Sequence, residues 1–163
     1  MEEKFQYKYY LDEGIFDIQD GHFEDAVIKI SKSIEIKKDF EVSYFYRAVA
    51  YQAQEKWDEA MLDYTTALQI NPKMTDAYYN RAKIILSRKD IENPKIENAI
   101  KDLESALKLD DKFIDALFAM GAAKKKLGKY KEAIEYLDRA IEIDKDAIHA
   151  KALKKLIETK YLK

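Results

Sequence analysis

The side chains that could carry out covalent or metal chemistry are few in this chain. It has no cysteine, so it can form neither a thiolate nucleophile nor a thiolate zinc site. Its two histidines, His22 and His149, are separated by 127 positions, and we expect them to lie too far apart to share a metal ion. No His-Glu-x-x-His pair, glycine-rich phosphate loop or nucleophile elbow occurs. The sequence therefore predicts a protein without catalytic activity, cofactor or metal.

Lysines concentrate between residues 124 and 131, where they could contact an acidic protein or RNA. The cluster consists of Lys124, Lys125, Lys126, Lys129 and Lys131. No aromatic stacking motif of the single-strand-binding type accompanies it, and the net charge of the whole chain is only -2. We therefore interpret the cluster as a solvated face and expect no nucleic-acid partner.

The composition also bears on where the protein works. The first residues, Met1-Glu2-Glu3-Lys4, are acidic and lack the apolar core of a secretory signal. The chain contains no run of 18 apolar residues, so we expect no membrane span. The absence of cysteine is compatible with a reducing compartment. Together these features predict a cytoplasmic protein with no membrane partner.

The elements that position the remaining side chains follow from a pattern that occurs four times. An alanine follows an acidic or amide residue at spacings of 34, 39 and 34, and a small residue follows seven positions later at the same spacings. These residues are Ala26, Ala60, Ala99 and Ala133, then Ser33, Ala67, Ala106 and Ala140. Self-similarity at such a period is typical of a solenoid, whose extended concave surface favours binding as the function.

Each repeat is predicted to form two helices. In residues 41–74, apolar residues recur at helical spacing in two stretches, and Pro72 ends the second because proline cannot continue a helix. Gly14 and Gly121 fall in mid-helix, where we expect a neighbouring helix to come too close for a larger side chain. Gly21 and Gly128 fall in the turn between the two helices, where a positive φ is useful.

The phase of the pattern places a five-residue insertion at residues 89–93, followed by a helix that starts at Asn93-Pro94. The last helix, 148–163, is predicted to cap the array with an apolar face made of Ile148, Ala152, Leu153, Leu156 and Ile157. We therefore predict one domain over residues 1–163, made of the repeats 7–40, 41–74, 75–113 and 114–147 and the capping helix.

The repeats resemble the tetratricopeptide repeat (TPR) family. The segment that carries the resemblance best runs from Trp57-Asp58-Glu59-Ala60 through Ala67-Leu68-Gln69-Ile70-Asn71-Pro72. The resemblance implies an all-α fold, a right-handed superhelical solenoid of antiparallel helix pairs. The chain departs from the pattern in places. Asp17 and Lys124 stand where the second repeat has Tyr51, Ile96 replaces the turn aromatic, and only the second repeat keeps the closing proline.

In this family the first helix of each repeat lines the concave groove, and peptides bind there. Carried over position by position, the resemblance implies a peptide-binding groove with an apolar, aromatic strip and a few polar groups. These groove residues are Leu11, Ile15, Phe45, Tyr46, Val49, Tyr79, Asn80, Lys83 and Phe118, with Asp76 and Asp115 beside them. Asn80 could pair with a ligand backbone or hydrogen-bond within the protein. The alternative for several others is packing within or between repeats.

Some family members hold the C-terminal carboxylate of heat-shock chaperones with a clamp of two lysines, two asparagines and one arginine. If the clamp lay in the first three repeats, its five places would be occupied by Leu11, Ile15, Tyr46, Asp76 and Asn80. If it lay in the second to fourth repeats, they would be occupied by Phe45, Val49, Asn80, Asp115 and Ala119. Only Asn80 fits, and the two aspartates would repel a carboxylate. We therefore expect the partner not to be such a chaperone tail.

Two functions remain open. The first is a non-enzymatic protein-interaction module, a scaffold or adaptor whose groove binds an apolar or amphipathic segment of a protein partner. The alternative is a structural subunit that self-associates into a homo-oligomer, through the groove or through oppositely charged ends. Residues 1–74 carry a net charge of -6 and residues 75–163 a net charge of +4.

Overall fold

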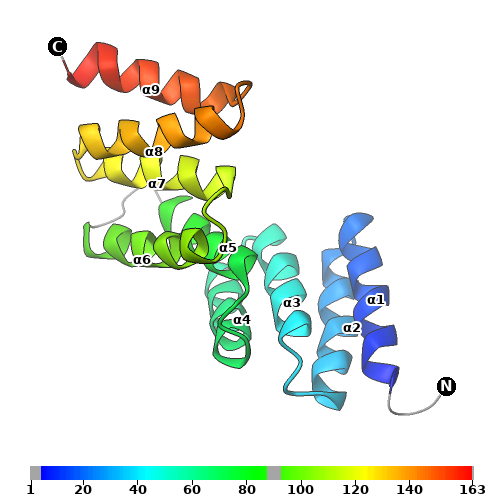
Figure 1. The fold of residues 1–163 in the computed structure, drawn as a ribbon. Helices are drawn as coiled ribbons and strands as arrows, with labels where there is room; N and C mark the ends of the chain where they lie inside the picture. Colours follow the sequence, from blue (N-terminus) through cyan, green and yellow to red (C-terminus); the bar gives the residue numbers. More distant parts are fainter. Residues whose placement is uncertain (1–4, 88–92, 163) are drawn as a thin grey trace. The chain divides into compact units, whose positions relative to one another are not determined.

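A computed structural model of the chain describes residues 5–87 and 93–162, and all the regular structure in these residues is helical (Figure 1). The predicted insertion lies mostly outside the described residues, which resume at Asn93, the first residue of a helix. No helix within the described ranges is long and apolar enough to cross a membrane. The helices are α1 (Gln6–Gln19), α2 (Phe23–Ile36), α3 (Glu41–Ala53), α4 (Trp57–Ile70), α5 (Thr75–Ser87), α6 (Asn93–Leu109), α7 (Ile114–Lys126), α8 (Tyr130–Ile143) and α9 (Ile148–Tyr161).

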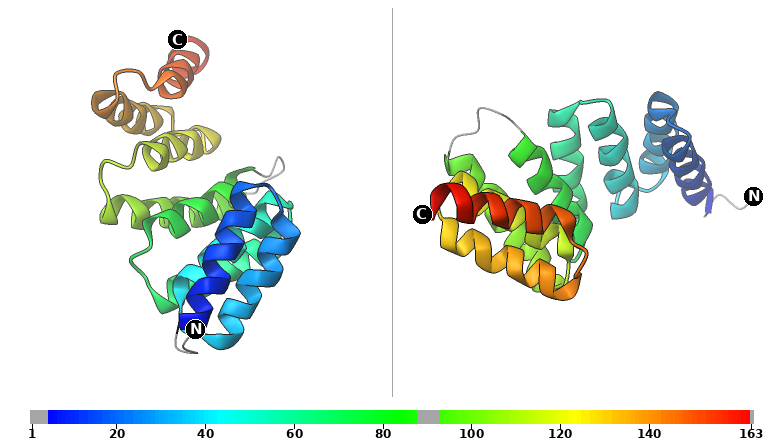
Figure 2. Two further views of the ribbon diagram at one scale, coloured as in Figure 1. Left: turned by 90° about the vertical axis from the view of Figure 1, so that its right-hand side faces the viewer. Right: turned by 90° about the horizontal axis from the view of Figure 1, so that it is seen from above.

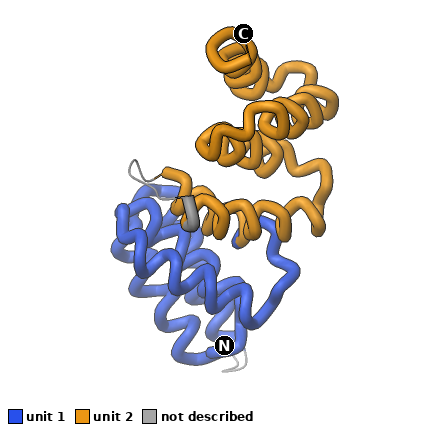
Figure 3. Tube along the Cα trace, turned by 90° about the vertical axis from the view of Figure 1, so that its left-hand side faces the viewer, with its two compact units in different colours: residues 1–77 blue, residues 78–163 orange. Residues whose placement is uncertain are grey.

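The helices divide between two compact units (Figure 3). The N-terminal unit, residues 1–77, contains α1 to α4, in which each helix packs on the next along the chain. The C-terminal unit, residues 78–163, contains most of α5 and all of α6 to α9, and α7 packs on both α6 and α8. Each unit is thus built from helix pairs of the predicted kind (Figure 2).

The two helices of a pair touch where the sequence places its smallest residues. A Cβ atom added to Gly121 would lie 2.8 Å from Cγ of Leu137 and 3.2 Å from the carbonyl oxygen of Ala133, and one added to Gly14 would collide with Ile30. The repeated alanines Ala26, Ala60, Ala99 and Ala133 are all fully buried, as are Ser33, Ala67, Ala106 and Ala140. These contacts confirm the prediction that larger side chains are excluded there.

The turns inside the first, second and fourth pairs share one backbone conformation. Gly21 and Gly128 have φ of 81° and 74°, which confirms the predicted use of glycine in these turns. Glu55 occupies the equivalent place in the second repeat and has φ of 58°. The turn therefore keeps the left-handed conformation even where the residue is not glycine.

Two of the pairs are also held by a two-pronged ion pair between the first and second helix. Arg47 Nε and Nη2 donate to Asp63 at 2.7 and 2.9 Å, and its Nη1 donates to Ser31 at 3.0 Å. The rings of Tyr44 and Tyr51 lie 5.8 and 5.9 Å from this guanidinium. In the C-terminal unit, Arg81 and Asp102 repeat the arrangement with bonds of 2.8 and 2.7 Å.

The residues that depart from the repeat pattern form ion pairs of their own. Asp17, which is buried, lies 2.8 Å from Lys29 Nζ. Lys124 Nζ donates to Glu132 at 2.7 Å, and this hydrogen bond raises the pKa of Lys124 and lowers the pKa of Glu132. Each charged residue that stands in place of the tyrosine, Asp17 or Lys124, is thus ion-paired with a residue on the second helix of its pair.

The last helix packs through only part of the predicted face, because Leu153 and Ile157 lie in the cluster with the preceding repeat as predicted, whereas Ile148, Ala152 and Leu156 do not. Ala150 and Ile157 are buried and Leu153 is half-buried, whereas Ile148 and Leu156 are 73% and 43% exposed. Lys154 links α9 to α8, because its Nζ donates to Asp138 at 2.6 Å. The prediction that Ile148, Ala152 and Leu156 face the preceding repeat is wrong.

Replacing Ala60 by leucine should lower the free energy of unfolding by about 1–3 kcal/mol, because the contact between α3 and α4 has no room for three more carbons. Chemical denaturation followed by circular dichroism measures this loss. Leu62→Ala is the control, since Leu62 on the same helix is 67% exposed and its truncation should change stability by less than about 0.5 kcal/mol. An unchanged denaturation midpoint for Ala60→Leu would contradict the close contact.

The Arg47–Asp63 pair offers a second test. Asp63→Ala should lower the free energy of unfolding by about 2–3 kcal/mol, because it removes both carboxylate oxygens from a largely buried guanidinium, which keeps its hydrogen bond to Ser31. The fourth repeat has Met120 and Tyr136 in these places. The double variant Arg47→Met with Asp63→Tyr should therefore stay within about 1 kcal/mol of the parent in urea denaturation. A loss equal to that of the single variant would show that the charges themselves are required.

Candidate functional site

The predicted groove residues lie on the first helices of the repeats, α1, α3, α5 and α7. In the N-terminal unit α1 contacts α3, and in the C-terminal unit α7 contacts α9, so neighbouring first helices lie side by side within each unit. Lys83 is exposed, and seven of the other predicted residues are half-buried. The half-buried residues are Ile15, Phe45, Tyr46, Val49, Tyr79, Asn80 and Phe118.

Leu11 differs from the other predicted residues. It is only 4% exposed and belongs to the hydrophobic cluster that also contains Ala26, Ile30 and Ala50. Its side chain points between α1, α2 and α3 because a branched apolar residue at this place fills the contact between them. Leu11 is therefore a core residue of the N-terminal unit and offers no surface to a ligand.

A hollow of about 350 Å³ lies beside α3 in the N-terminal unit. Val42, Phe45 and Tyr46 form one wall, and residues 73–76, which lead from α4 into α5, form the other. The Phe45 ring meets Tyr46 edge-on at 5.3 Å and lies 5.7 Å from the ring of Tyr64. Two aromatic neighbours thus hold Phe45 in place at the hollow.

The supports of this hollow are fixed by hydrogen bonds. The fully buried Tyr64 donates its hydroxyl to Gln52 at 3.1 Å, and its burial raises the pKa of the phenol. Asn71 donates from Nδ2 to Glu41 Oε1 at 3.1 Å and accepts the backbone N–H of Lys73 at 3.0 Å. The loop that forms the second wall is therefore attached to the start of α3.

A second hollow, of about 270 Å³, lies beside α7 in the C-terminal unit. Ile114, Asp115 and Phe118 form one wall, and residues 144–150, which lead from α8 into α9, form the other. The ring of Phe118 lies 6.3 Å from that of His149. Asp144 accepts the backbone N–H of Asp146 at 2.8 Å and so shapes the loop as Asn71 does in the first hollow.

The two hollows occupy equivalent places in the second and fourth repeats. Phe45 and Phe118 are 73 positions apart, as are Lys73 and Asp146. The charges around the rings differ, because the first hollow has Lys73 with Asp76, whereas the second has three aspartates and a histidine. One backbone arrangement thus presents an aromatic ring with two different chemical surroundings.

Tyr79 stands at the same place in the third repeat, where its half-buried ring packs against another aromatic side chain. The ring packs edge-on against Phe113, with 5.1 Å between the ring centroids. Phe113 occupies the repeat position that is Met74 at the first hollow and Ala147 at the second. Burial raises the pKa of the Tyr79 phenol, and the nearby carboxylate of Asp115 raises it further. The ammonium of Lys83 lies 5.6 Å from the ring.

The loop residues of the two hollows were absent from the sequence prediction. They come from the segments that follow the second helix of a repeat, and they include Lys73, Met74, Asp144, Asp146 and His149. A signal existed, because Asn71, Asp110 and Asp144 share one repeat position and each accepts a backbone N–H two residues later. Such turns predict a fixed loop next to the first helix.

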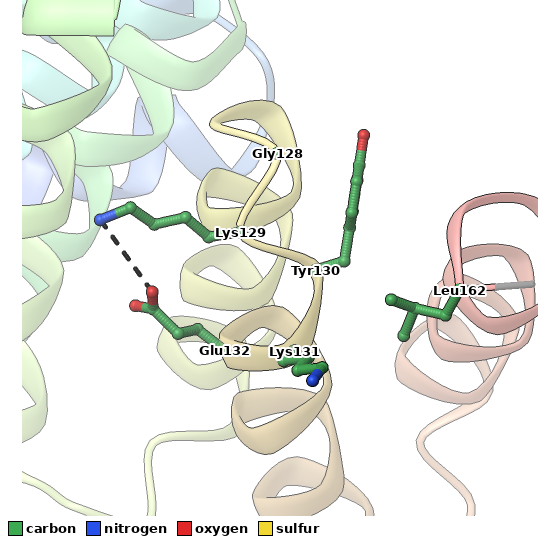
Figure 4. Close-up of a pocket in the computed structure, with 6 residues that line it drawn as sticks. All are labelled: Gly128, Lys129, Tyr130, Lys131, Glu132 and Leu162. Atoms are coloured by element: carbon green, nitrogen blue, oxygen red, sulfur yellow. Dashed lines mark ion pairs between the residues drawn. The ribbon is translucent and has the colours of Figure 1, made fainter.

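A further hollow lies at the lysine-rich end of the C-terminal unit, between the start of α8 and the end of α9 (Figure 4). The side chains of Tyr130 and Leu162 face one another there, and the Tyr130 ring stacks on Tyr161 at 4.5 Å. Glu132 pairs with Lys124 and lies 4.0 Å from Lys129. Two lysines of the cluster, Lys124 and Lys129, thus lie close to the carboxylate of Glu132.

The chain resembles known proteins in sequence. Residues 42–74 and 114–146, which are the second and fourth predicted repeats, match the tetratricopeptide repeat family. Tetratricopeptide repeat protein 12 of Homo sapiens is 30% identical over 105 residues, which are 57% of this chain and 15% of that protein. The DnaJ homolog subfamily C member 7 homolog of Schizosaccharomyces pombe is 35% identical over 56% of this chain and 19% of that protein. This chain thus spans less than a fifth of the length of these two relatives.

Solved structures resemble the chain in fold. MamA protein matches with a TM-score of 0.85 at 18% identity, covering 96% of this chain and 82% of the other. The first TPR of Spaghetti, solved with the HSP90 peptide SRMEEVD, matches with a TM-score of 0.69 at 24% identity, over 76% of this chain and 94% of the other. At these identities the likeness shows the fold, and it confirms the predicted class, an all-α solenoid of antiparallel helix pairs.

The surroundings of Tyr79 lead to a prediction about pH. The phenol should titrate above the range of an ordinary tyrosine, and Asp115→Asn should lower its pKa only in part, because burial is the larger cause. Carbon-13 labelling of the tyrosine Cζ atoms measures the titration by NMR, and Tyr79→Phe assigns the signal. A Tyr79 titration that Asp115→Asn leaves unchanged would place the carboxylate away from the ring.

Proposed function

We propose that this chain, which belongs to the tetratricopeptide-repeat proteins, is a non-enzymatic protein-interaction module that binds an apolar or amphipathic segment of a partner protein. The binding surface is the row of first helices together with the loops that lead into the next repeat. The single observation that carries the proposal is the pair of equivalent hollows, each with a half-buried phenylalanine between a first helix and a fixed loop.

The physical reason lies in how such a hollow binds. Phe45 is held by Tyr46 and Tyr64, so its ring loses little conformational freedom when a partner side chain packs on it. Rigid aromatic groups in a concave site with a polar rim are typical of energetic hot spots. The walls already supply backbone and carboxylate groups that can accept hydrogen bonds from a bound segment.

The charges around the second hollow define the partner further. Asp115, Asp144 and Asp146 surround the ring of Phe118, so a segment with an apolar residue next to a lysine or arginine fits there. A free C-terminal carboxylate would be repelled. The first TPR of Spaghetti was solved with an HSP90 peptide, but of the clamp residues this chain retains only Asn80. We therefore propose an internal, basic and amphipathic segment as the ligand.

A displayed library of random peptides tests this function, because it offers the chain many different candidate segments at once. Selected peptides should combine aromatic or aliphatic residues with lysine or arginine, and they should bind the purified chain in fluorescence anisotropy. Phe45→Ala and Phe118→Ala should each weaken a selected peptide about thirtyfold, which corresponds to about 2 kcal/mol.

Leu62→Ala is the matched control, because Leu62 is an exposed apolar residue on α4, away from the first hollow, and its loss should leave affinity unchanged. Circular dichroism shows whether each variant keeps its helices. Selected peptides that bind equally well to both phenylalanine variants would place the binding surface elsewhere on the chain.

A further inference from the structure

Helix α1 carries a row of exposed aromatic rings that neither the core nor the hollows use. Phe5, directly before α1, is 50% exposed, and Tyr9 and Phe16 on the helix are 45% and 60% exposed. Spacings of four and seven residues place these three rings on one side of the helix. The exposed carboxylates of Asp12 and Asp20 lie on the same side by their spacing. We call these five residues the α1 face.

Helix α9 has an exposed apolar row of its own. Ile148 and Leu156 are 73% and 43% exposed, and Ala152 lies between them at a spacing of four residues, also exposed. The exposed lysines Lys151 and Lys155 flank this row. The row lies opposite the side on which Ala150 and Ile157 pack against the preceding repeat. We call it, with its two lysines, the α9 face.

The charges of the two faces are opposite. The α1 face carries the exposed carboxylates of Asp12 and Asp20, and the ammonium of Lys8 lies beside it, 5.9 Å from the Phe5 ring. The α9 face carries the exposed ammonium groups of Lys151 and Lys155. Contact between two α1 faces would oppose carboxylates, and contact between two α9 faces would oppose ammonium groups. An α1 face against an α9 face alone brings apolar rows together with unlike charges beside them.

We propose that the α1 face of one copy of this chain binds the α9 face of a second copy. Apolar rows rimmed by charge are typical of interaction surfaces, and here each row finds its complement on the same chain. The contact is heterologous, so every added copy leaves one free face of each kind, and the assembly grows as an open chain unless it closes into a ring. This surface goes beyond the proposed peptide-binding function, with Ile148 as the one residue that also lines the second hollow.

Sedimentation velocity over a range of protein concentrations tests the proposal. The average mass of the parent chain should rise with concentration, and the dissociation constant should rise with added salt because the exposed charges are screened. The α1-face variant is Tyr9→Asp with Phe16→Asp, and the α9-face variant is Lys155→Glu with Leu156→Asp, which spares Ile148. Each variant alone should associate at least about tenfold more weakly, a change of about 1.4 kcal/mol.

The decisive measurement is an equal mixture of the two variants. Each retains one intact face, so the mixture should form a dimer and nothing larger. Ile28→Asp with Leu62→Asp is the control, because both residues are exposed and apolar but lie on α2 and α4. It should associate like the parent chain, and so should Phe45→Ala, which separates this contact from peptide binding. A parent chain of constant mass, a variant that still associates alone, or a mixture that stays monomeric would each overturn the proposal.

Discussion

The constraint on which the rest of this structure depends is the close approach of the two helices in each repeat. Glycine or alanine occupies the contact in every repeat, and the space beyond the Cα atoms of Gly14 and Gly121 is already filled by Ile30 and Leu137. Protein interiors are packed so densely that one added methyl group has to displace a neighbour. The hollows beside Phe45 and Phe118 lie between the first helix of such a pair and the segment that follows its second helix.

The charged contacts between the two helices of a pair differ from repeat to repeat. Arg47–Asp63 and Arg81–Asp102 link the helices of the second and third repeats, Lys29–Asp17 links those of the first with reversed polarity, and Met120 stands in the fourth. A buried ion pair contributes little net stability when an apolar pair of similar volume fits as well. The repeats can therefore exchange polar for apolar contacts while the backbone stays the same. This freedom allows two equivalent hollows to have different charges.

The repeat frame and the two-helix units could be predicted from the sequence, because the small residues and the turn glycines follow from steric limits that act locally. Which side of α9 is buried was harder to predict. The row Ile148, Ala152 and Leu156 looks like a packing face by its spacing, yet Ala150 and Ile157 are the residues that are buried, and Lys154 reaches Asp138 of α8. An amphipathic pattern indicates that a side is apolar, but it does not show whether a neighbour covers it. Leu11 is the opposite case, because it was predicted to line the groove but is buried in the core of the N-terminal unit.

The peptide-binding surface is tested most directly by identifying the residues that a bound segment touches. Amide chemical shifts of the isotope-labelled chain, recorded with and without a basic amphipathic peptide selected from a random library, report this residue by residue. If the two hollows bind the segment, the shifts should change around Phe45 with residues 73–76 and around Phe118 with residues 144–149. Changes confined to the exposed sides of α2 and α4, around Ile28 and Leu62, would contradict binding in the hollows.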